Sequence, residues 1–600
     1  MTDHRHAPRR RRHAPRPGRP RAAVVAVLLA GAVVAGCGGG GEEGAGEGGT
    51  LKVVGSADPD HVDPASGYST VSGVLSRQFA RTLFGFRAHN DFAQAITVRP
   101  DVAVEVPTTA NGGISEDGRT YTVRLRRGVL WNTRPPREVV AADFVRGLKR
   151  LCNPAQPSGA ISYYTATIQG MEAFCEGYEN VDGKDARAMA DYQNRHQISG
   201  LAARDAWTLV VRLTRPANDF VNILAMQFAA AAPAEYDRYV PDSPEFRRNT
   251  VSDGPYQITR YTANKEFVLE RNPVWRAGTD PLREQRPARI QITLGQDSPE
   301  TVQQMMELGS ADLAWDQPVP TSRIQGLRSH EDFRIMKGSS LNPYLVFNLL
   351  SPNNGRALAK VEVRRAIQYA VNKSALVKIY GGRAVSEVLD QVITPGSVGH
   401  RRFDLYPTPE DRGDPARCRR TLAAAGYPRG LRLRFPYRTQ SNHPKVAQSV
   451  QADLRECGIT AVITPDTNGN FYGRTLVTPA DAREGKWDIA APGWVPDWYG
   501  NNGRTTIVPL FDGRTYGQNS TNYGGYNDPE VNRLIDAALA ARTVREAAGF
   551  WARADRRIME DAAIVPFMNQ NYPIFHSARV GEAHYLPQYQ SYDFNRIELS

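Results

Sequence analysis

Residues 51–600 contain neither a sharp linker nor an internal repeat that would divide them into independent domains. Strand-like runs such as 121–125 alternate with helical stretches such as 361–380, where apolar residues recur at three-to-four spacing. Two further helices are predicted at 529–541 and 545–561. This alternation predicts an α/β protein with mixed sheets. The 550 residues are enough for two or three hydrophobic cores rather than one.

The first 36 residues show a distinctive order of charge and hydropathy. Residues 1–21 hold eight arginines and one acid, and residues 22–35 form an uncharged apolar run that is too short to cross a bilayer as a mature helix. Small residues then precede Cys37, an arrangement that resembles the lipobox of bacterial lipoproteins. We predict a lipoprotein signal peptide at 1–36 and lipidation of Cys37 at the extracytoplasmic face of the cell membrane. An ordinary signal peptide with an incidental cysteine is the alternative.

A glycine-rich, mildly acidic tether follows at 37–50. It contains a G-x-G-x-x-G match at 44–49, but no strand precedes it and no helix follows, so it predicts no dinucleotide cofactor. The formal net charge of +11 comes largely from the export signal: removing eight of 74 basic and one of 63 acidic residues leaves 66 and 62, or +4. Composition therefore does not support a nucleic-acid-binding surface.

Four cysteines remain after Cys37, and their spacing forms two sequence-local pairs. In an oxidising compartment we predict the disulfides Cys152–Cys175 and Cys418–Cys457, although four cysteines allow three connectivities. Zinc binding is the rival interpretation, but neither pair has C-x-x-C spacing, and no metal site is expected.

The stretch 493–501, G-W-V-P-D-W-Y-G-N, places two tryptophans and a tyrosine around Asp497. The flanking glycines and the proline indicate a loop. A carboxylate among large rings has two interpretations from the residues alone. It caps a turn over core aromatics, or it pairs with a positively charged guest, since an unpaired buried charge is costly.

Ten segments, in register along nearly the whole mature chain, resemble one family. They are similar to extracellular solute-binding proteins of family 5, the oligopeptide- and dipeptide-binding components of bacterial ABC importers. The matching segments lie at 51–54 with 62–64, 121–131, 141–144, 253–256, 269–273, 307–312, 344–348, 363–367, 425–428 and 451–459. Asp143 in the third of these stands near the start of a helix, where negative charge is favoured.

The resemblance implies an α/β fold in the form of a two-lobed periplasmic-binding-protein clamshell, type II-like with mixed sheets, and with an extra subdomain in the first lobe. The first lobe is expected at 51–341, with the subdomain at about 88–205, and the chain returns to it at 568–600. The second lobe is expected at 342–567, entered and left by two crossing strands.

The resemblance also implies a ligand site. In peptide-binding members, an aspartate three residues after a tryptophan pairs with the ligand's α-ammonium group, and Asp497 stands at that spacing from Trp494. The family's second acid and proline are replaced here by Gly500 and Asn501, which puts the floor beyond the anchor in doubt. The predicted ligand-contacting residues are Asp497, Trp494, Gly493, Trp498, Tyr499 and Tyr68.

The function that the resemblance implies is capture rather than catalysis. A monomer would bind a peptide with a free α-amine, without cofactor, and present it to a membrane permease and its partner ATPases. Oligosaccharide is the runner-up ligand, because the aromatic loop suits sugar stacking. An exported hydrolase is a further alternative, although no H-E-x-x-H, G-x-S-x-G or Walker motif is present. A signalling or chaperone-like role for the same cleft also stays open.

Overall fold

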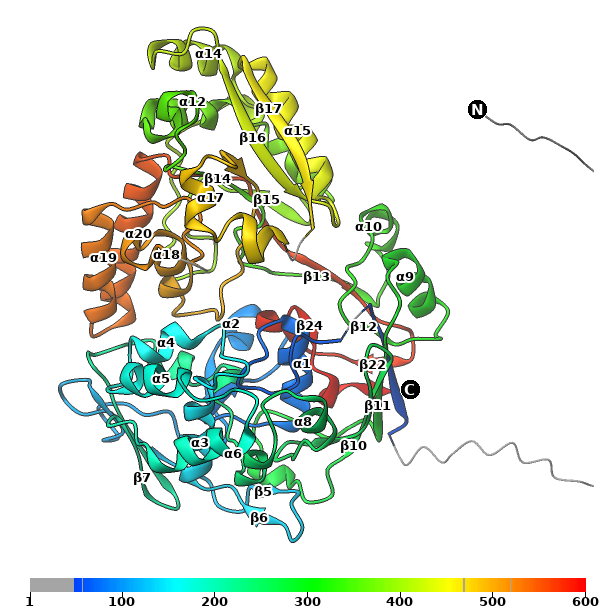
Figure 1. Cartoon of the computed structure of the whole chain (residues 1–600). Helices are drawn as coiled ribbons and strands as arrows, with labels where there is room; N and C mark the ends of the chain where they lie inside the picture. Colours follow the sequence, from blue (N-terminus) through cyan, green and yellow to red (C-terminus); the bar gives the residue numbers. More distant parts are fainter. Residues whose placement is uncertain (1–47, 57, 468–469, 518–519) are drawn as a thin grey trace, which may run out of the picture. The chain divides into compact units, whose positions relative to one another are not determined.

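The computed structural model describes residues 48–600 except 57, 468–469 and 518–519 (Figure 1). The predicted signal peptide, Cys37 and the tether up to residue 47 lie outside the described residues. Within the described part, no helix is both long and apolar enough to cross a membrane.

A five-stranded mixed sheet forms the base of the first lobe. Its strand order is β12-β1-β11-β10-β9, in which β1 runs parallel to β11 and β12, while β10 is antiparallel to both of its neighbours. The mixed sheets predicted from the sequence are thereby confirmed. The bounds are β1 Thr50–Val54, β9 Tyr256–Thr262, β10 Glu266–Arg271, β11 Arg289–Thr293 and β12 Leu313–Ala314, with α1 at Thr70–Phe79. Alternate residues such as Leu51 and Val53 are fully buried, as expected for a strand with one face on a core.

A second layer of the first lobe is built from a three-stranded antiparallel sheet and short helices. The sheet has the order β4-β8-β7. The bounds are β4 Thr120–Arg124, β7 Leu201–Asp205, β8 Thr208–Arg212, α3 Ala141–Arg150, α4 Ile161–Thr165, α5 Met171–Glu179, α6 Ala186–Arg195 and α7 Phe220–Ile223. Asp143 lies in the first turn of α3, where its carboxylate accepts hydrogen bonds from the Val140 amide (3.0 Å) and the Trp131 indole (3.0 Å). The predicted helix start is confirmed.

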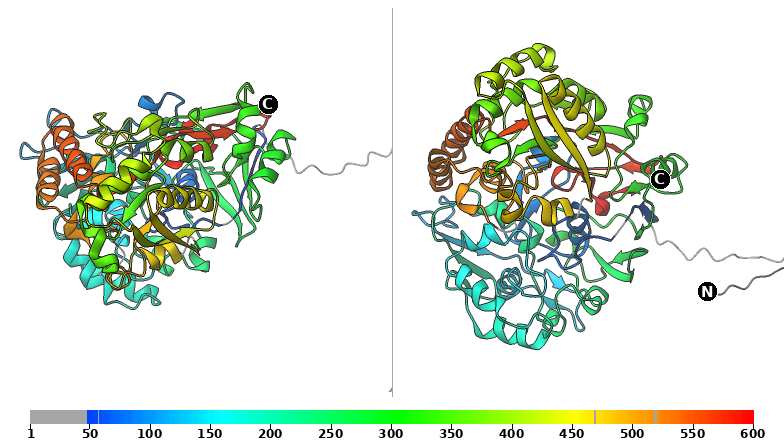
Figure 2. Two further views of the ribbon diagram at one scale, coloured as in Figure 1. Left: turned by 90° about the horizontal axis from the view of Figure 1, so that it is seen from above. Right: turned by 45° about the horizontal axis from the view of Figure 1, so that its top comes forward.

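The second lobe is organised around β14, which pairs antiparallel with β18 and β19, and around the parallel pair β16–β17. Figure 2 shows α15 running along the β16–β17 ribbon, against which it packs. The strands are β14 Tyr344–Phe347, β16 Leu431–Arg438, β17 Ile459–Asp466, β18 Ile489–Ala490 and β19 Ile564–Pro566. The helices are α12 Val361–Ala370, α13 Lys373–Ile379, α14 Pro415–Ala424, α15 His443–Glu456, α18 Gly503–Phe511, α19 Pro529–Ala540 and α20 Val544–Glu560.

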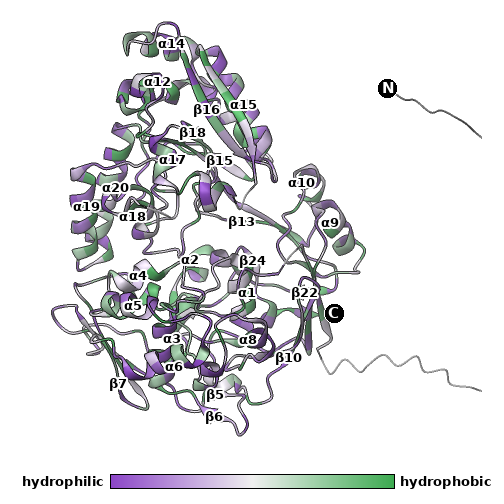
Figure 3. Ribbon diagram, viewed as in Figure 1, coloured by the Kyte–Doolittle hydropathy of each residue, from purple (hydrophilic) through white to green (hydrophobic). Residues whose placement is uncertain are grey.

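The prediction of one helical stretch at 361–380 is wrong in one respect, because the chain forms two helices there, α12 and α13. The side chain of Asn372 accepts a hydrogen bond from the Ala375 amide (2.9 Å) and so begins a new helix after a break. The two helices predicted near the C-terminus are confirmed as α19 and α20. Figure 3 shows that both carry hydrophilic and hydrophobic residues, and the buried set on α19 recurs at three-to-four spacing.

Two antiparallel pairs lie where the chain passes between the lobes. Strand β13 (Phe333–Met336) pairs with β21 (Tyr572–Phe575), and β15 (Ser386–Val388) pairs with β20 (Met568–Gln570). These pairs fit the expected entry and return of the chain. The boundaries at 341/342 and 567/568, and the subdomain at about 88–205, stay predictions.

Both predicted disulfides, Cys152–Cys175 and Cys418–Cys457, are present, with sequence separations of 23 and 39 residues. The first joins the region after α3 to α5, and the second joins α14 to the end of α15. Each bond therefore links two helical segments within one lobe.

Replacing Cys418 and Cys457 together by alanine is expected to lower the free energy of unfolding by about 4 kcal/mol, because the closed loop restricts the unfolded chain. Chemical denaturation monitored by circular dichroism measures the effect. The matched double variant Cys152→Ala/Cys175→Ala removes the disulfide that closes the shorter loop. Its free energy of unfolding should therefore fall slightly less. An unchanged denaturation midpoint for the first pair would contradict the stabilising role.

Candidate ligand-binding site

The loop 493–501 follows β18 and is held against the crossing segment of the chain. Trp494 and Leu341 exchange two backbone hydrogen bonds, at 2.8 and 2.9 Å. The Gly493 amide donates to the Tyr472 hydroxyl (3.0 Å). A side chain at Gly493 would meet the Asn342 amide oxygen at 2.0 Å, so the Asn342 side chain would have to move to admit one. The predicted close approach of ligand backbone to Gly493 stays a prediction.

Two tyrosine hydroxyls of the first lobe donate hydrogen bonds to the carboxylate of Asp497. Tyr68, just before α1, donates to one oxygen at 2.7 Å, and Tyr163, on α4, donates to the other. Burial raises the pKa of Asp497, while the two hydroxyl bonds act in the opposite direction. The carboxylate of the second lobe therefore meets donors of the first lobe, and no cation among the described residues forms an ion pair with it.

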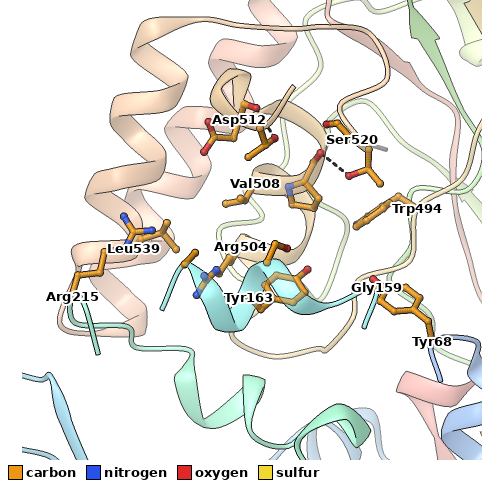
Figure 4. Close-up of a pocket in the computed structure, with 15 residues that line it drawn as sticks. Tyr68, Gly159, Tyr163, Arg215, Trp494, Arg504, Val508, Asp512, Ser520 and Leu539 are labelled. Atoms are coloured by element: carbon orange, nitrogen blue, oxygen red, sulfur yellow. Dashed lines mark hydrogen bonds between the residues drawn. The ribbon is translucent and has the colours of Figure 1, made fainter. Parts of the chain in front are cut away.

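A cavity of about 390 Å³ adjoins this cluster (Figure 4). Tyr68 and Trp494, both predicted site residues, line it together with Tyr163, which the sequence reasoning missed. The indole of Trp494 donates to the Thr505 carbonyl (2.6 Å), which fixes the ring at the cavity wall. The remaining lining residues are Gly159, Ser162, Ala166, Arg215, Arg504, Val508, Pro509, Asp512, Thr515, Ser520, Thr521 and Leu539.

Trp498 and Tyr499 lie behind the cavity wall rather than on it. Both are essentially fully buried. Trp498 packs edge-on against Tyr163 with ring centres 5.1 Å apart, and Tyr499 packs edge-on against Phe92 of α2 (Phe92–Ala95) at 5.6 Å. In this arrangement Trp498 positions Tyr163. Direct ligand contact by the two residues stays a prediction.

Beyond the contact of Asp497 with the two tyrosines, the lobes touch through further polar contacts. The side chain of Asn501 donates to the side-chain oxygen of Asn218 (2.7 Å). Arg504, on α18, forms an ion pair with Asp219 (3.4 Å) and donates to the Thr167 hydroxyl (2.9 Å). Asn501, one of the departures from the family pattern, is thus part of the contact between the lobes.

Arg438 at the end of β16 is a candidate cation that the sequence reasoning did not identify. It is only 8% exposed, and its guanidinium donates to the Ala491 carbonyl (3.2 Å), two residues before Gly493. It lies over the rings of Phe471 and Tyr472 (5.6 and 5.1 Å). Within the described residues no carboxylate pairs with it, and its Nε has no hydrogen-bond partner.

The proline at position 436 of β16 is the one sequence feature that accompanies the burial of Arg438. Strand β16 alternates buried and exposed residues up to Phe435, so that Arg432 and Arg434 face outward. The alternation breaks where Pro436 follows Phe435, with both residues buried, and Arg438 is then buried as well. A strictly alternating strand would instead place Arg438 on the exposed face, with Arg432 and Arg434.

Burial, and then the charge of Arg438, lower the pKa of His443 to about 3. The folded protein therefore binds fewer protons than the unfolded chain, whose histidine has its ordinary value of 6.5. The stability conferred by the uncharged ring is complete above pH 6.5 and is lost as the pH falls toward 3.

His443→Gln is expected to reduce the loss of stability between pH 7 and pH 5 by about 2 kcal/mol relative to the wild type. Denaturation midpoints at both pH values measure the difference. His330→Gln, at a half-exposed histidine, is the matched control and should track the wild type. Parallel pH curves for His443→Gln and the wild type would contradict the assignment.

Comparison with known proteins places the chain in a family. Residues 97–510 match the model for bacterial extracellular solute-binding proteins, family 5. The periplasmic oligopeptide-binding protein OppA of Haemophilus influenzae is 24% identical over 467 residues, covering 76% of this chain and 78% of that protein.

Solved structures of peptide-binding proteins are similar to this chain over most of its length. A clavulanic acid biosynthesis oligopeptide binding protein 2 superposes with a TM-score of 0.81 at 27% identity, covering 92% of this chain and 96% of that one. The periplasmic binding protein DppA from Helicobacter pylori, solved with the peptide STSA, gives a TM-score of 0.70 at 20% identity over 92% and 98%, a likeness of fold.

The chain belongs to the bacterial extracellular solute-binding proteins of family 5. Its fold is the two-lobed one predicted from the sequence, with mixed sheets. The family is one of transport binding proteins rather than enzymes.

Proposed function

We propose that this protein captures peptides with free termini between its lobes and delivers them to an ABC permease. The observation that carries the proposal is the Asp497 carboxylate of the second lobe, held by the Tyr68 and Tyr163 hydroxyls of the first. An α-ammonium group supplies the cation that this carboxylate lacks, and charge-assisted hydrogen bonds between the two are the strong kind. Membership of the family and the peptide-binding relatives support the same ligand class.

Arg438 is the proposed partner of the ligand's carboxylate. The segment 491–497 carries a charge at each end. The Arg438 guanidinium donates to the Ala491 carbonyl at its beginning, and Asp497 is its last residue. A peptide lying along this segment would satisfy one unpaired charge at each end. Because a ligand favours closure only through its extra affinity for the closed state, contacts from both lobes to one ligand are what drive closure.

Arg438→Gln is expected to weaken binding of Ala-Ala-Ala roughly 30-fold, about 2 kcal/mol, because the ligand carboxylate loses a buried charged partner. The same variant should bind the C-terminally amidated peptide about as well as the wild type does. Isothermal titration calorimetry measures both affinities, with Arg432→Gln on the exposed face of the same strand as the matched control. Equal losses for the free and amidated peptides would contradict the role.

Membrane attachment is part of the proposal. Lipidation of Cys37 after removal of residues 1–36 would hold the protein at the extracytoplasmic face, and the tether would leave the lobes free to reach the permease. The predicted monomer suits a carrier that docks with one permease at a time.

Oligosaccharide is the second candidate ligand. The rings of Trp494 and Tyr163 line the cavity together with the hydroxyl-bearing Ser162, Ser520 and Thr521, a combination that suits sugar stacking and hydrogen bonding. A sugar, however, leaves Asp497 and Arg438 without opposite charges, so the peptide is the better match.

A further inference from the structure

The cavity has two chemically different ends. Tyr68 and Gly159 line one end, and Arg215, Arg504 and Leu539 lie together toward the other (Figure 4). Arg504 is buried, at 4% exposed, and Arg215, three residues after β8, is partly exposed. Two guanidinium groups, one from each lobe, therefore line the end away from Tyr68.

Neither guanidinium is fully paired within the part of the chain that the structure describes. Arg504 reaches Asp219 at 3.4 Å and the Thr167 hydroxyl at 2.9 Å. Arg215 reaches Asp536 only at 3.8 Å, and it makes no hydrogen bond within the described residues. A guanidinium has five N–H donors, so both groups keep donors for a further acceptor.

The surrounding acids are engaged by another arginine. The other carboxylate oxygen of Asp536 accepts from Arg514 at 2.7 Å. Asp512, the one carboxylate among the described residues that line the cavity, accepts from the Nε and Nη2 of Arg514, each at 2.8 Å. Arg514 thus offsets the negative charge of Asp512 and competes with Arg215 for Asp536.

The two lining cations also repel each other. Burial, and next the charge of Arg504, lower the pKa of Arg215. An anion between the two guanidinium groups would relieve that repulsion and accept charge-assisted hydrogen bonds from both.

Tyr163 links this end of the cavity to the amine anchor. Its hydroxyl donates to Asp497, and the Arg504 guanidinium lies 5.6 Å from the centre of its ring. A ligand whose ammonium sits at Asp497 can therefore place a nearby side chain beside Arg504. Only the first residues of a peptide lie close enough to its amine to do so.

We propose that the cavity end formed by Arg215 and Arg504 is a specificity subsite for an acidic side chain, glutamate or aspartate, in the first two residues of the ligand. The proposal rests on the proposed peptide-binding function. Closing the lobes over such a side chain brings the two arginines, one from each lobe, onto one carboxylate.

Calorimetric titration of the purified protein with five tripeptides tests the subsite: Ala-Ala-Ala, Glu-Ala-Ala, Gln-Ala-Ala, Ala-Glu-Ala and Ala-Gln-Ala. At one of the two positions, glutamate should bind at least tenfold more tightly than glutamine. Arg215→Gln removes a partly exposed side chain without a hydrogen bond and should reduce that ratio to below threefold. Arg204→Gln, at an exposed arginine of β7, should keep the wild-type ratio.

The outcomes separate the two proposals. Equal affinities for glutamate and glutamine at both positions, with Ala-Ala-Ala still bound, would overturn the subsite and leave peptide binding intact. An unchanged ratio in Arg215→Gln would overturn the assignment to this arginine pair. No binding of any of the five peptides would overturn the proposed function itself.

Discussion

Replacing Asp497 with asparagine is expected to weaken binding of a free-amine tripeptide on the order of 100-fold, about 3 kcal/mol. Asparagine keeps the size of the side chain but removes the charge that would pair with the ammonium. Each tyrosine hydroxyl now donates to a different carboxylate oxygen, so in asparagine one hydroxyl can donate to the remaining oxygen and the other can rotate to accept from the new NH2 group. The loss therefore reports the charge rather than a collapse of the loop.

The N-acetylated form of the same peptide separates the anchor from general damage. It carries no ammonium, so its affinity, already low, should differ little between wild type and Asp497→Asn. Calorimetry of both peptides with both proteins completes the cycle. A loss of affinity of equal size for the acetylated peptide would contradict the pairing of Asp497 with the ligand's ammonium group.

The second large effect is on stability. Asp101→Ala is expected to lower the free energy of unfolding by about 3–5 kcal/mol, because it removes the shared partner of two buried arginines. Asp101 accepts from Arg81 at 2.9 Å and from Arg283 at 2.6 Å, and the three side chains are at most 3% exposed. Of the ion-pair partners that the described residues give these arginines, Asp280 would then remain for both cations.

Chemical denaturation measures this loss. The matched control is Glu530→Ala, which breaks an exposed pair with Arg533 at adjacent helix turns and should leave the midpoint unchanged. If Asp101→Ala unfolds at the wild-type midpoint, the buried network does not stabilise the first lobe as described.

Local features of the fold were predictable from the sequence because their causes are local. The start of α3 depends on Asp143 and its own first turn. Each cysteine pair spans two helical segments that are close in sequence. The break between α12 and α13 was missed although its cause, Asn372, is also local, because apolar spacing continues across it.

The site was only half predictable. Asp497 and Trp494 were predicted from their spacing within one loop. Tyr68 was predicted from its place after the first strand of the family pattern. The contact of Tyr163 with Asp497 joins residues 334 positions apart, and it exists only because the two lobes meet there. Arg438 was missed because its burial depends on a change of strand face at Pro436 and on the neighbouring segment 491–493.

Native mass spectrometry of the protein purified without refolding tests the central claim most directly. Proteins that enclose a ligand between two lobes can retain it through purification, and the released mass identifies its class. We expect a peptide with free amino and carboxyl termini. A bound oligosaccharide, or an empty protein that only oligosaccharides stabilise against heat, would contradict the account and make Asp497 a hydroxyl acceptor instead of an amine anchor.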